Sequence, residues 1–101
     1  MAIAEIKVWP VGTEDPSISS YIRECFEIAE ENNSIEAVLT PTSTILEGEL
    51  SDLFMVAQSM HQAPFHQGCA RVVTTITIDE RHDSPTHMEG MVDSVINVGQ
   101  N

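Results

Sequence analysis

Two ten-residue stretches near opposite ends of the chain alternate in side-chain character, and this alternation constrains the fold more than any other feature. They are residues 2–11 and 70–79. In the first stretch, Ala4, Ile6 and Val8 alternate with Glu5, Lys7 and Trp9. In the second stretch, Val72, Thr74, Ile76 and Ile78 alternate with Arg71, Val73, Thr75, Thr77 and Asp79. Successive side chains of a strand point to opposite faces of a sheet, so each stretch is predicted to be a strand with two different faces.

Three other segments repeat their apolar residues at a helical spacing. Residues 17–32 and 49–62 each carry an apolar stripe opposite charged or polar positions, which predicts two amphipathic helices. Pro64 is expected to stop the second helix, because proline has no backbone N–H and clashes with the preceding turn. Thr86, followed by Glu89 three residues later, matches a capping box and predicts a short last helix.

Residues 35–40 and 44–47 alternate again and predict a hairpin between the two helices. The order is then β-α-β-β-α-β plus a C-terminal helix, which predicts a single α+β domain over residues 1–101 with the ferredoxin-like fold. Both helices should cover one face of a four-stranded antiparallel sheet. The side chains expected under the helices are Ile6, Val8, Leu39, Val72, Ile76 and Ile78. Those expected on the open face are Glu5, Lys7, Trp9, Thr40, Arg71, Val73, Thr75 and Thr77.

The chain is strongly acidic. Sixteen acidic residues against four basic ones give a formal charge of −12, which argues against nucleic acid and anionic membranes as partners. The N-terminal residues lack a basic region followed by an apolar run, and no stretch is apolar enough to span a bilayer. The chain is therefore predicted to be cytoplasmic, with Cys25 and Cys69 as two reduced thiols.

Catalytic and metal-binding patterns are not evident. The four histidines fall at positions 61, 66, 82 and 87, and none shares a metal-ligand spacing with another on one helix face. Ser43 and Cys69 stand in no nucleophile context. We therefore expect no metal site, no catalytic residues and no enzymatic activity.

The most informative stretch is the predicted hairpin, residues 39–48, because hydroxyl side chains are crowded into it. Turn stabilisation is one explanation, since Ser and Thr satisfy turn backbone groups. The other is a site that recognises a polar heterocycle through neutral donors and acceptors. The candidate ligand-binding residues are Trp9, Thr40, Thr42, Ser43, Thr44, Glu47 and Thr75.

Several segments, in this order and spacing, resemble one known family. They are Val11-Gly12-Thr13, Pro16-Ser17-Ile18-Ser19, Leu39-Thr40-Pro41, Thr44, Glu47-Gly48, the run from Met60 to Phe65, and the run from Arg71 to Asp83. Together they cover about residues 3–97 and are similar to the small thiamine-binding proteins of the YkoF-like group. The resemblance implies a ferredoxin-like fold, homo-oligomers built through the sheets, and binding of thiamine or its hydroxymethylpyrimidine moiety.

The leading hypothesis is therefore a cytosolic, non-enzymatic binder of thiamine or hydroxymethylpyrimidine that needs no other cofactor and forms a homodimer or homotetramer. In this reading Trp9 offers a stacking plane, and the hairpin hydroxyls pair with the aminopyrimidine. Glu47, or another acid, accepts from the amine or balances the thiazolium charge. The alternatives are a structural or regulatory homo-oligomer with no small-molecule ligand, and an enzyme of another kind.

Overall fold

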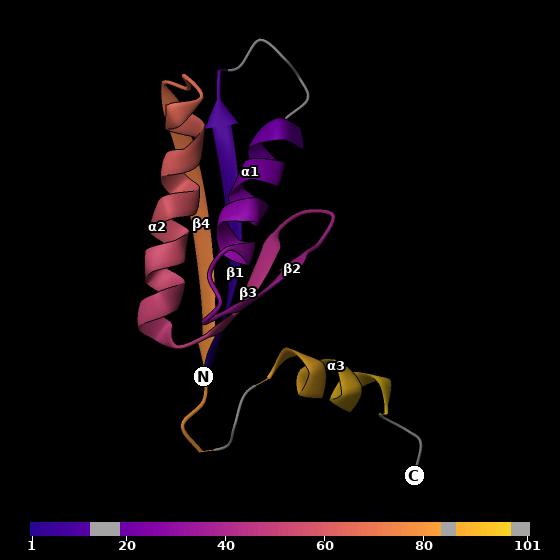
Figure 1. Ribbon diagram of the computed structural model, residues 1–101. Coiled ribbons are helices and arrows are strands. Elements are labelled where there is room, and N and C mark those ends of the chain that lie inside the picture. The colour runs from indigo at the N-terminus through magenta and orange to yellow at the C-terminus, as the bar shows by residue number, and fades with distance from the viewer. Residues whose placement is uncertain (13–18, 84–86, 98–101) are drawn as a thin grey trace.

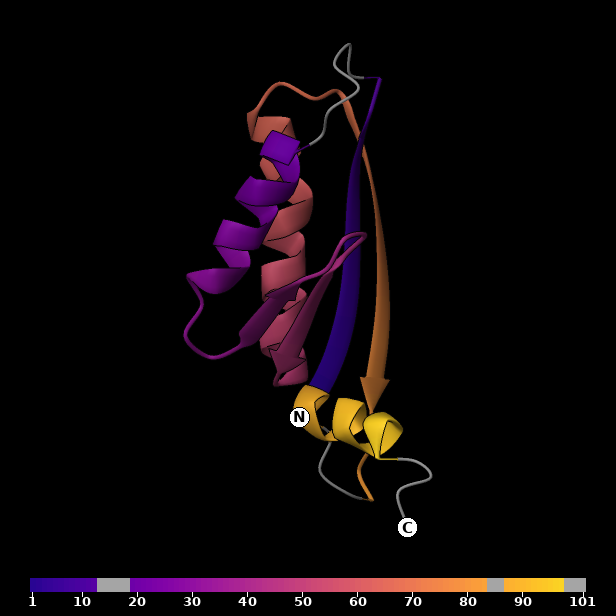
Figure 2. The ribbon, with the colours of Figure 1, turned by 90° about the vertical axis from the view of Figure 1, so that its right-hand side faces the viewer.

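A computed structural model describes residues 1–12, 19–83 and 87–97. Its elements follow the order β-α-β-β-α-β-α, and Figure 1 labels them along the chain. They are β1 (Ala2–Val11), α1 (Ser19–Glu30), β2 (Glu36–Leu39), β3 (Thr44–Gly48), α2 (Leu50–His66), β4 (Arg71–Glu80) and α3 (Met88–Ile96). The four strands form one antiparallel sheet in the order β2-β3-β1-β4. The ferredoxin-like α+β fold predicted from the sequence is thus confirmed, with α1 and α2 on the same face (Figure 2).

The central strand β1 is paired unequally on its two sides. Along β4 it is paired over its whole length, from Ala2 opposite Glu80 to Val11 opposite Arg71. Along β3 the pairing runs only from Ala2 opposite Gly48 to Ile6 opposite Thr44. The second half of β1 therefore has no strand neighbour on the β3 side.

The core lies between the sheet and the two long helices. Small side chains dominate it where the layers meet, which lets the helices approach the sheet closely. The buried apolar residues are Ala2, Ala4, Ile6, Cys25, Ala29, Ile35, Leu46, Leu53, Val56, Ala57, Met60 and Ala63. Their alternation along β1 confirms the predicted helix-facing side of that strand.

Three side chains predicted to be buried under the helices are exposed instead. Leu39 is 48% exposed, Ile76 39% and Ile78 38%. Their register with Thr44, Ile6 and Ala4 does place them on the helix-facing side. However, β2 and β4 are the two edge strands, so the helices cover their side chains only in part. On the opposite face, Trp9 and Val73 are each 42% exposed, as expected for a sheet face without a covering layer.

The helix α2 continues past Pro64 to His66, which corrects the expected end near residue 62. Proline in this position leaves the Met60 carbonyl without its usual N–H partner four residues later. The Cys25 thiol of α1 fills that gap by donating to the Met60 carbonyl oxygen at a distance of 3.3 Å. A tertiary contact thus compensates for the hydrogen bond that the proline removes.

The helix then ends in a Schellman motif. Gly68 adopts φ +93°, its N–H donates to the Phe65 carbonyl (3.0 Å), and the Cys69 N–H donates to the Pro64 carbonyl (3.1 Å). A glycine suits this position because the left-handed conformation costs it little.

The last helix, α3, packs less tightly than the others. His87 is its N-cap residue, whereas the predicted cap Thr86 lies outside the described residues. None of its described side chains is buried, and Figure 2 shows it beyond the end of the sheet where β4 ends. Its N-cap residue is bonded to the sheet, with His87 Nδ1 2.7 Å from Glu47 Oε1.

The bond between Cys25 and the carbonyl of Met60 predicts a coupling between Cys25 and Pro64. Cys25→Ala should lower the free energy of unfolding by about 2 kcal/mol, through a small cavity and an orphaned carbonyl. In a Pro64→Ala background the restored N–H can bond that carbonyl, so the same change should cost about 1 kcal/mol less. Urea unfolding of the parent, both single variants and the double variant measures the difference. Equal costs in both backgrounds would contradict the role given to the thiol.

The same thiol should make stability depend on alkaline pH. Burial, reinforced by the nearby Glu24 carboxylate, raises the pKa of Cys25 from 9.0 to about 11. The unfolded chain therefore loses this proton first, and ionisation favours unfolding as the pH rises from about 9 to about 11. The parent should lose roughly 2–3 kcal/mol more than Cys25→Ala over this range. Urea unfolding of both proteins at each pH tests this. The same loss of unfolding free energy in both proteins would contradict it.

Candidate functional site

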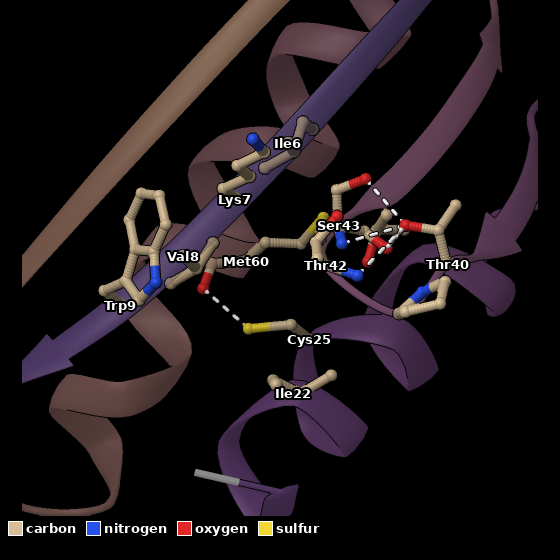
Figure 3. A pocket seen from close by; sticks show the side chains of 12 residues that line it. Ile6, Lys7, Val8, Trp9, Ile22, Cys25, Thr40, Thr42, Ser43 and Met60 are labelled. Carbon is tan, nitrogen blue, oxygen red and sulfur yellow. Dashed lines mark hydrogen bonds between the residues drawn. The ribbon is translucent and has the colours of Figure 1, made fainter.

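A pocket of about 430 Å³ lies beside the unpaired half of β1. Figure 3 shows its walls: β1 on one side, the tip of the β2–β3 hairpin on another, and α1 and α2 behind. The lining residues are Ile6, Lys7, Val8, Trp9, Ile22, Cys25, Thr40, Pro41, Thr42, Ser43, Thr44 and Met60. Its volume falls in the range of pockets that hold small organic ligands.

The pocket exists because β3 begins at Thr44, opposite Ile6, and the chain before it turns away from β1. The edge of β1 beyond Ile6, with its backbone N–H and C=O groups, consequently borders the space that a longer hairpin would fill. Alternate positions then contribute differently: Val8 points toward the helices, while Lys7 and Trp9 belong to the open face. The result is an apolar wall of helix and strand side chains next to a polar hairpin tip.

Much of the hydrogen-bonding capacity of the hairpin-tip hydroxyls is used within the tip. Thr40 Oγ1 accepts from the N–H of Ser43 (2.9 Å) and of Thr42 (3.3 Å), and the Thr40 N–H donates to the Ser43 carbonyl (2.9 Å). The Ser43 hydroxyl donates to Glu5 Oε2 at 3.3 Å, which ties the tip to β1. Turn stabilisation therefore accounts for Thr40 and for part of Ser43.

Thr44 differs from its neighbours in the hairpin. Its side chain lines the pocket and the residue is only 4% exposed, yet its hydroxyl makes no hydrogen bond with any residue in the described part of the chain. A buried hydroxyl without a partner is uncommon and costs about 1–3 kcal/mol. A water or another small molecule in the pocket could supply the missing partner.

Trp9 and Lys7 border the pocket on the open side of β1. Trp9 is 42% exposed and lines the pocket, so its indole is partly accessible from the open side. Lys7 Nζ lies 3.7 Å from Glu5 Oε1, and the other oxygen of that carboxylate accepts from Ser43. One cation and one anion thus stand together at the edge of the pocket.

Two of the predicted site residues lie elsewhere. Glu47 sits at the far end of β3, opposite Ile3, and its carboxylate is bonded to His87. Thr75 lies on β4, opposite Lys7, with its side chain exposed on the open face. The structure brings together Trp9, Thr40, Thr42, Ser43 and Thr44, and that these residues bind a ligand stays a prediction.

The sequence interpretation did not include the helix residues of the pocket, which are Ile22, Cys25 and Met60. All three lie on apolar helix stripes, a pattern that core residues share, so no signal in the sequence separates them. Lys7 was assigned only to the open face of the sheet. The shape of the pocket, and with it the role of these residues, depends on where β3 ends.

The histidines of the chain lie apart from the pocket. His61 Nδ1 is 2.6 Å from Thr74 Oγ1 across α2 and β4, and His82 pairs with Glu80 on the surface. Among the described residues, no three His, Cys, Asp or Glu side chains are grouped so that they could hold a metal ion. Both cysteines are free thiols. In the same part of the chain, no helix is long and apolar enough to cross a membrane.

A small α+β domain with an open pocket beside a strand edge is a fold and site suited to binding a small molecule. Comparison with known sequences identifies the group: a model of the thiamine-binding protein family matches residues 4–96, so this chain belongs to that family. The UPF0045 protein YqgV of Bacillus subtilis is 47% identical over 98 residues, covering 94% of each chain. A UPF0045 protein of Methanothermobacter thermautotrophicus is 34% identical over 96 residues, covering 94% of this chain and 96% of the relative.

Solved structures share the fold. A hypothetical protein of Methanocaldococcus jannaschii superposes with a TM-score of 0.85 at 24% identity, over 96% of this chain and 97% of the other. A candidate thiamine biosynthesis or salvage protein of Thermotoga maritima superposes with a TM-score of 0.76 at 22% identity, over 93% and 97%. At these identities the likeness establishes the fold alone.

The hydrogen bonds at the hairpin tip distinguish Thr40, whose hydroxyl stabilises the turn, from Thr42, whose hydroxyl has no partner among the described residues. Thr40→Val should lower the free energy of unfolding by about 1–2 kcal/mol, because two backbone N–H groups lose their acceptor. Thr42→Val should change it by less than about 0.5 kcal/mol, since that side chain is exposed and unbonded among the described residues. Thermal unfolding of both variants tests the contrast, and equal losses would show that the turn does not depend on the Thr40 hydroxyl.

Proposed function

We propose that this protein binds thiamine or its hydroxymethylpyrimidine moiety in the pocket beside β1, without chemical turnover. Membership of the thiamine-binding protein family supports the ligand class, as does the fold shared with the Thermotoga protein. The single observation that carries the site is the buried, unpartnered hydroxyl of Thr44, which lines a pocket of about 430 Å³. The matching family is described as one of binding proteins, which supports binding rather than catalysis.

The pocket chemistry fits an aminopyrimidine. The flat ring would lie among the apolar side chains of Val8, Ile22 and Met60, with the Trp9 indole at the open side. The Thr44 hydroxyl can donate to a ring nitrogen or accept from the exocyclic amine.

We assign to Glu5 the ligand-binding role that the sequence had suggested for Glu47. It is the acid bonded to the hairpin tip, through Ser43, and it stands beside Lys7 at the edge of the pocket. A carboxylate there can accept from the amine or balance the positive thiazolium ring of thiamine.

Thr44→Val is the sharpest test, because it removes one hydroxyl with little change in shape. It should weaken binding of thiamine and of hydroxymethylpyrimidine by about 5- to 150-fold, since the ligand group that pairs with Thr44 is left unpaired. It should leave folding stability unchanged or slightly raised, because the hydroxyl has no described partner to lose. Isothermal titration calorimetry and urea unfolding measure the two effects.

Ser59→Ala is the control, since it also removes a hydroxyl and Ser59 is an exposed residue of α2 that does not line this pocket. It should bind both ligands like the parent. Parent-like binding by Thr44→Val would show that the ligand sits elsewhere. A parent that binds neither compound would favour the structural or regulatory homo-oligomer. Conversion of thiamine during prolonged incubation would make the protein an enzyme.

The proposal includes self-association as a homodimer or homotetramer and a cytosolic location. An uncovered sheet face with Trp9 and Val73 exposed supports the first, because a patch of this kind suits contact with a second copy. Two free thiols suit a reducing compartment and support the second.

A further inference from the structure

Four consecutive residues of β1, from Ile6 to Trp9, line the pocket (Figure 3). Because successive side chains of a strand point to opposite faces of the sheet, a pocket that meets all four lies against the edge of the strand. The strand β3 pairs with β1 only as far as Ile6, which is opposite Thr44. The groups that this edge offers to the pocket are therefore the backbone N–H and C=O groups of the residues after Ile6.

Pro10 shows which of these backbone groups face the pocket. The N–H and C=O of one strand residue point to the same neighbouring strand, and those of the next residue point to the other. Proline has no N–H, so within sheets it is confined to positions where that N–H would not enter a ladder. Since Pro10 is paired with β4, opposite Val72, its backbone groups must be turned away from β4. By alternation Val8 is turned the same way, toward the pocket, while Lys7 and Trp9 are turned toward β4.

The Val8 N–H and C=O have no hydrogen-bond partner in the described part of the chain. If β3 were longer, its register would bring residue 42 opposite Val8. Thr42 instead lies in the turn, where its N–H donates to Thr40 Oγ1 (3.3 Å). Outside the helices and strands, none of the hydrogen bonds between described residues reaches the backbone of Val8. Two backbone groups that a neighbouring strand would normally satisfy thus border the pocket unpaired.

The unpaired edge is too short for another strand. At one end Thr44 already occupies the position opposite Ile6, and at the other end Pro10 has no N–H to donate. Between them only Val8 offers both a donor and an acceptor on the pocket side. The matching partner is a small molecule that carries an acceptor and a donor on neighbouring atoms. A 4-aminopyrimidine has this pair in its amine and the adjacent ring nitrogen.

We propose that the backbone of Val8 holds the aminopyrimidine ring: its N–H donates to the ring nitrogen beside the amine, and its C=O accepts one hydrogen of the amine. The ligand then takes the place of the strand residue that the short hairpin does not supply. The second hydrogen of the amine stays available to the Thr44 hydroxyl, which lines the same pocket. The inference rests on the proposed binding of thiamine and names the contact that orients its pyrimidine.

Amide hydrogen exchange, followed by NMR, tests which backbone groups are free. Without ligand, the Val8 N–H should exchange roughly a hundredfold faster than those of Lys7 and Trp9, which are turned toward β4. Saturating thiamine should reduce this difference at least about tenfold, because the Val8 N–H gains an acceptor. Slow exchange of the Val8 N–H in the free protein would show that it already has a partner and would overturn the proposal.

An amide-to-ester replacement puts an oxygen in place of the Val8 N–H and keeps every side chain. The natural Cys25 permits it, because synthetic residues 1–24 can be ligated to expressed residues 25–101 at this cysteine, with the ligated parent as reference. The ester at Val8 should weaken thiamine binding about tenfold in calorimetry. The ester at Ile3 is the matched control, since Ile3 is turned toward β4 and does not line the pocket. It should lower the urea midpoint more than the Val8 ester does, yet bind thiamine like the ligated parent.

A ligand analogue identifies the atom that the Val8 N–H meets. Thiamine with CH in place of the ring nitrogen beside the amine lacks the proposed acceptor, so it should bind the ligated parent about tenfold more weakly than thiamine does. It should bind the Val8 ester as well as it binds the ligated parent, because both changes remove the same hydrogen bond. Losses that multiply would place this nitrogen against another group and overturn the assignment.

Failure of this inference and failure of thiamine binding give different results. If the ligated parent binds thiamine and the Val8 ester binds it equally well, the backbone contact is wrong while thiamine binding stands. If neither the expressed nor the ligated parent binds thiamine or hydroxymethylpyrimidine, both proposals are wrong. Should the Val8 ester not fold, the exchange rates of Val8 with and without thiamine still decide the question.

Discussion

The unequal pairing of β1 is the constraint on which the rest of the molecule depends. β1 is paired with β4 along all ten residues but with β3 only from Ala2 to Ile6. A short hairpin therefore leaves half of one strand edge unpaired beneath two helices. The pocket occupies the space beside this unpaired edge, and the polar tip of the same short hairpin lines it. The site is thus a consequence of strand lengths more than of any special motif.

A second dependence joins the two long helices. Pro64 removes one backbone donor near the end of α2, and the Cys25 thiol of α1 bonds the Met60 carbonyl that is left over. Both Cys25 and Met60 line the pocket, so this contact also forms part of its wall. The buried thiol, whose pKa is raised to about 11, stays protonated at neutral pH and acts as a donor rather than as a nucleophile.

Side-chain periodicity was enough to predict every strand and helix in order, because alternation and helical spacing are local properties of the chain. What periodicity cannot report is which strands lie at the edges and how far each pair extends. That is why Ile76 and Ile78 were expected to be buried, and why Glu47 and Thr75 were grouped with a pocket that neither lines. The end of α2 was misplaced for a related reason: the proline rule is local, whereas the compensating thiol comes from another helix.

Three strand edges have no strand neighbour among the described residues: the outer edges of β2 and β4, and the second half of β1 on the β3 side. The free half of β1 borders the pocket, between α1 and α2 and a hairpin tip rich in hydroxyls. The outer edge of β4 is ten residues long and is flanked by the exposed side chains of Ile76 and Ile78. Lys7 and Thr75 are opposite each other between these edges. The pocket and the outer edge of β4 are therefore separated by two hydrogen-bonded strands. Because no residue of β4 lines the pocket, substitutions on the helix side of β4 should leave the pocket intact.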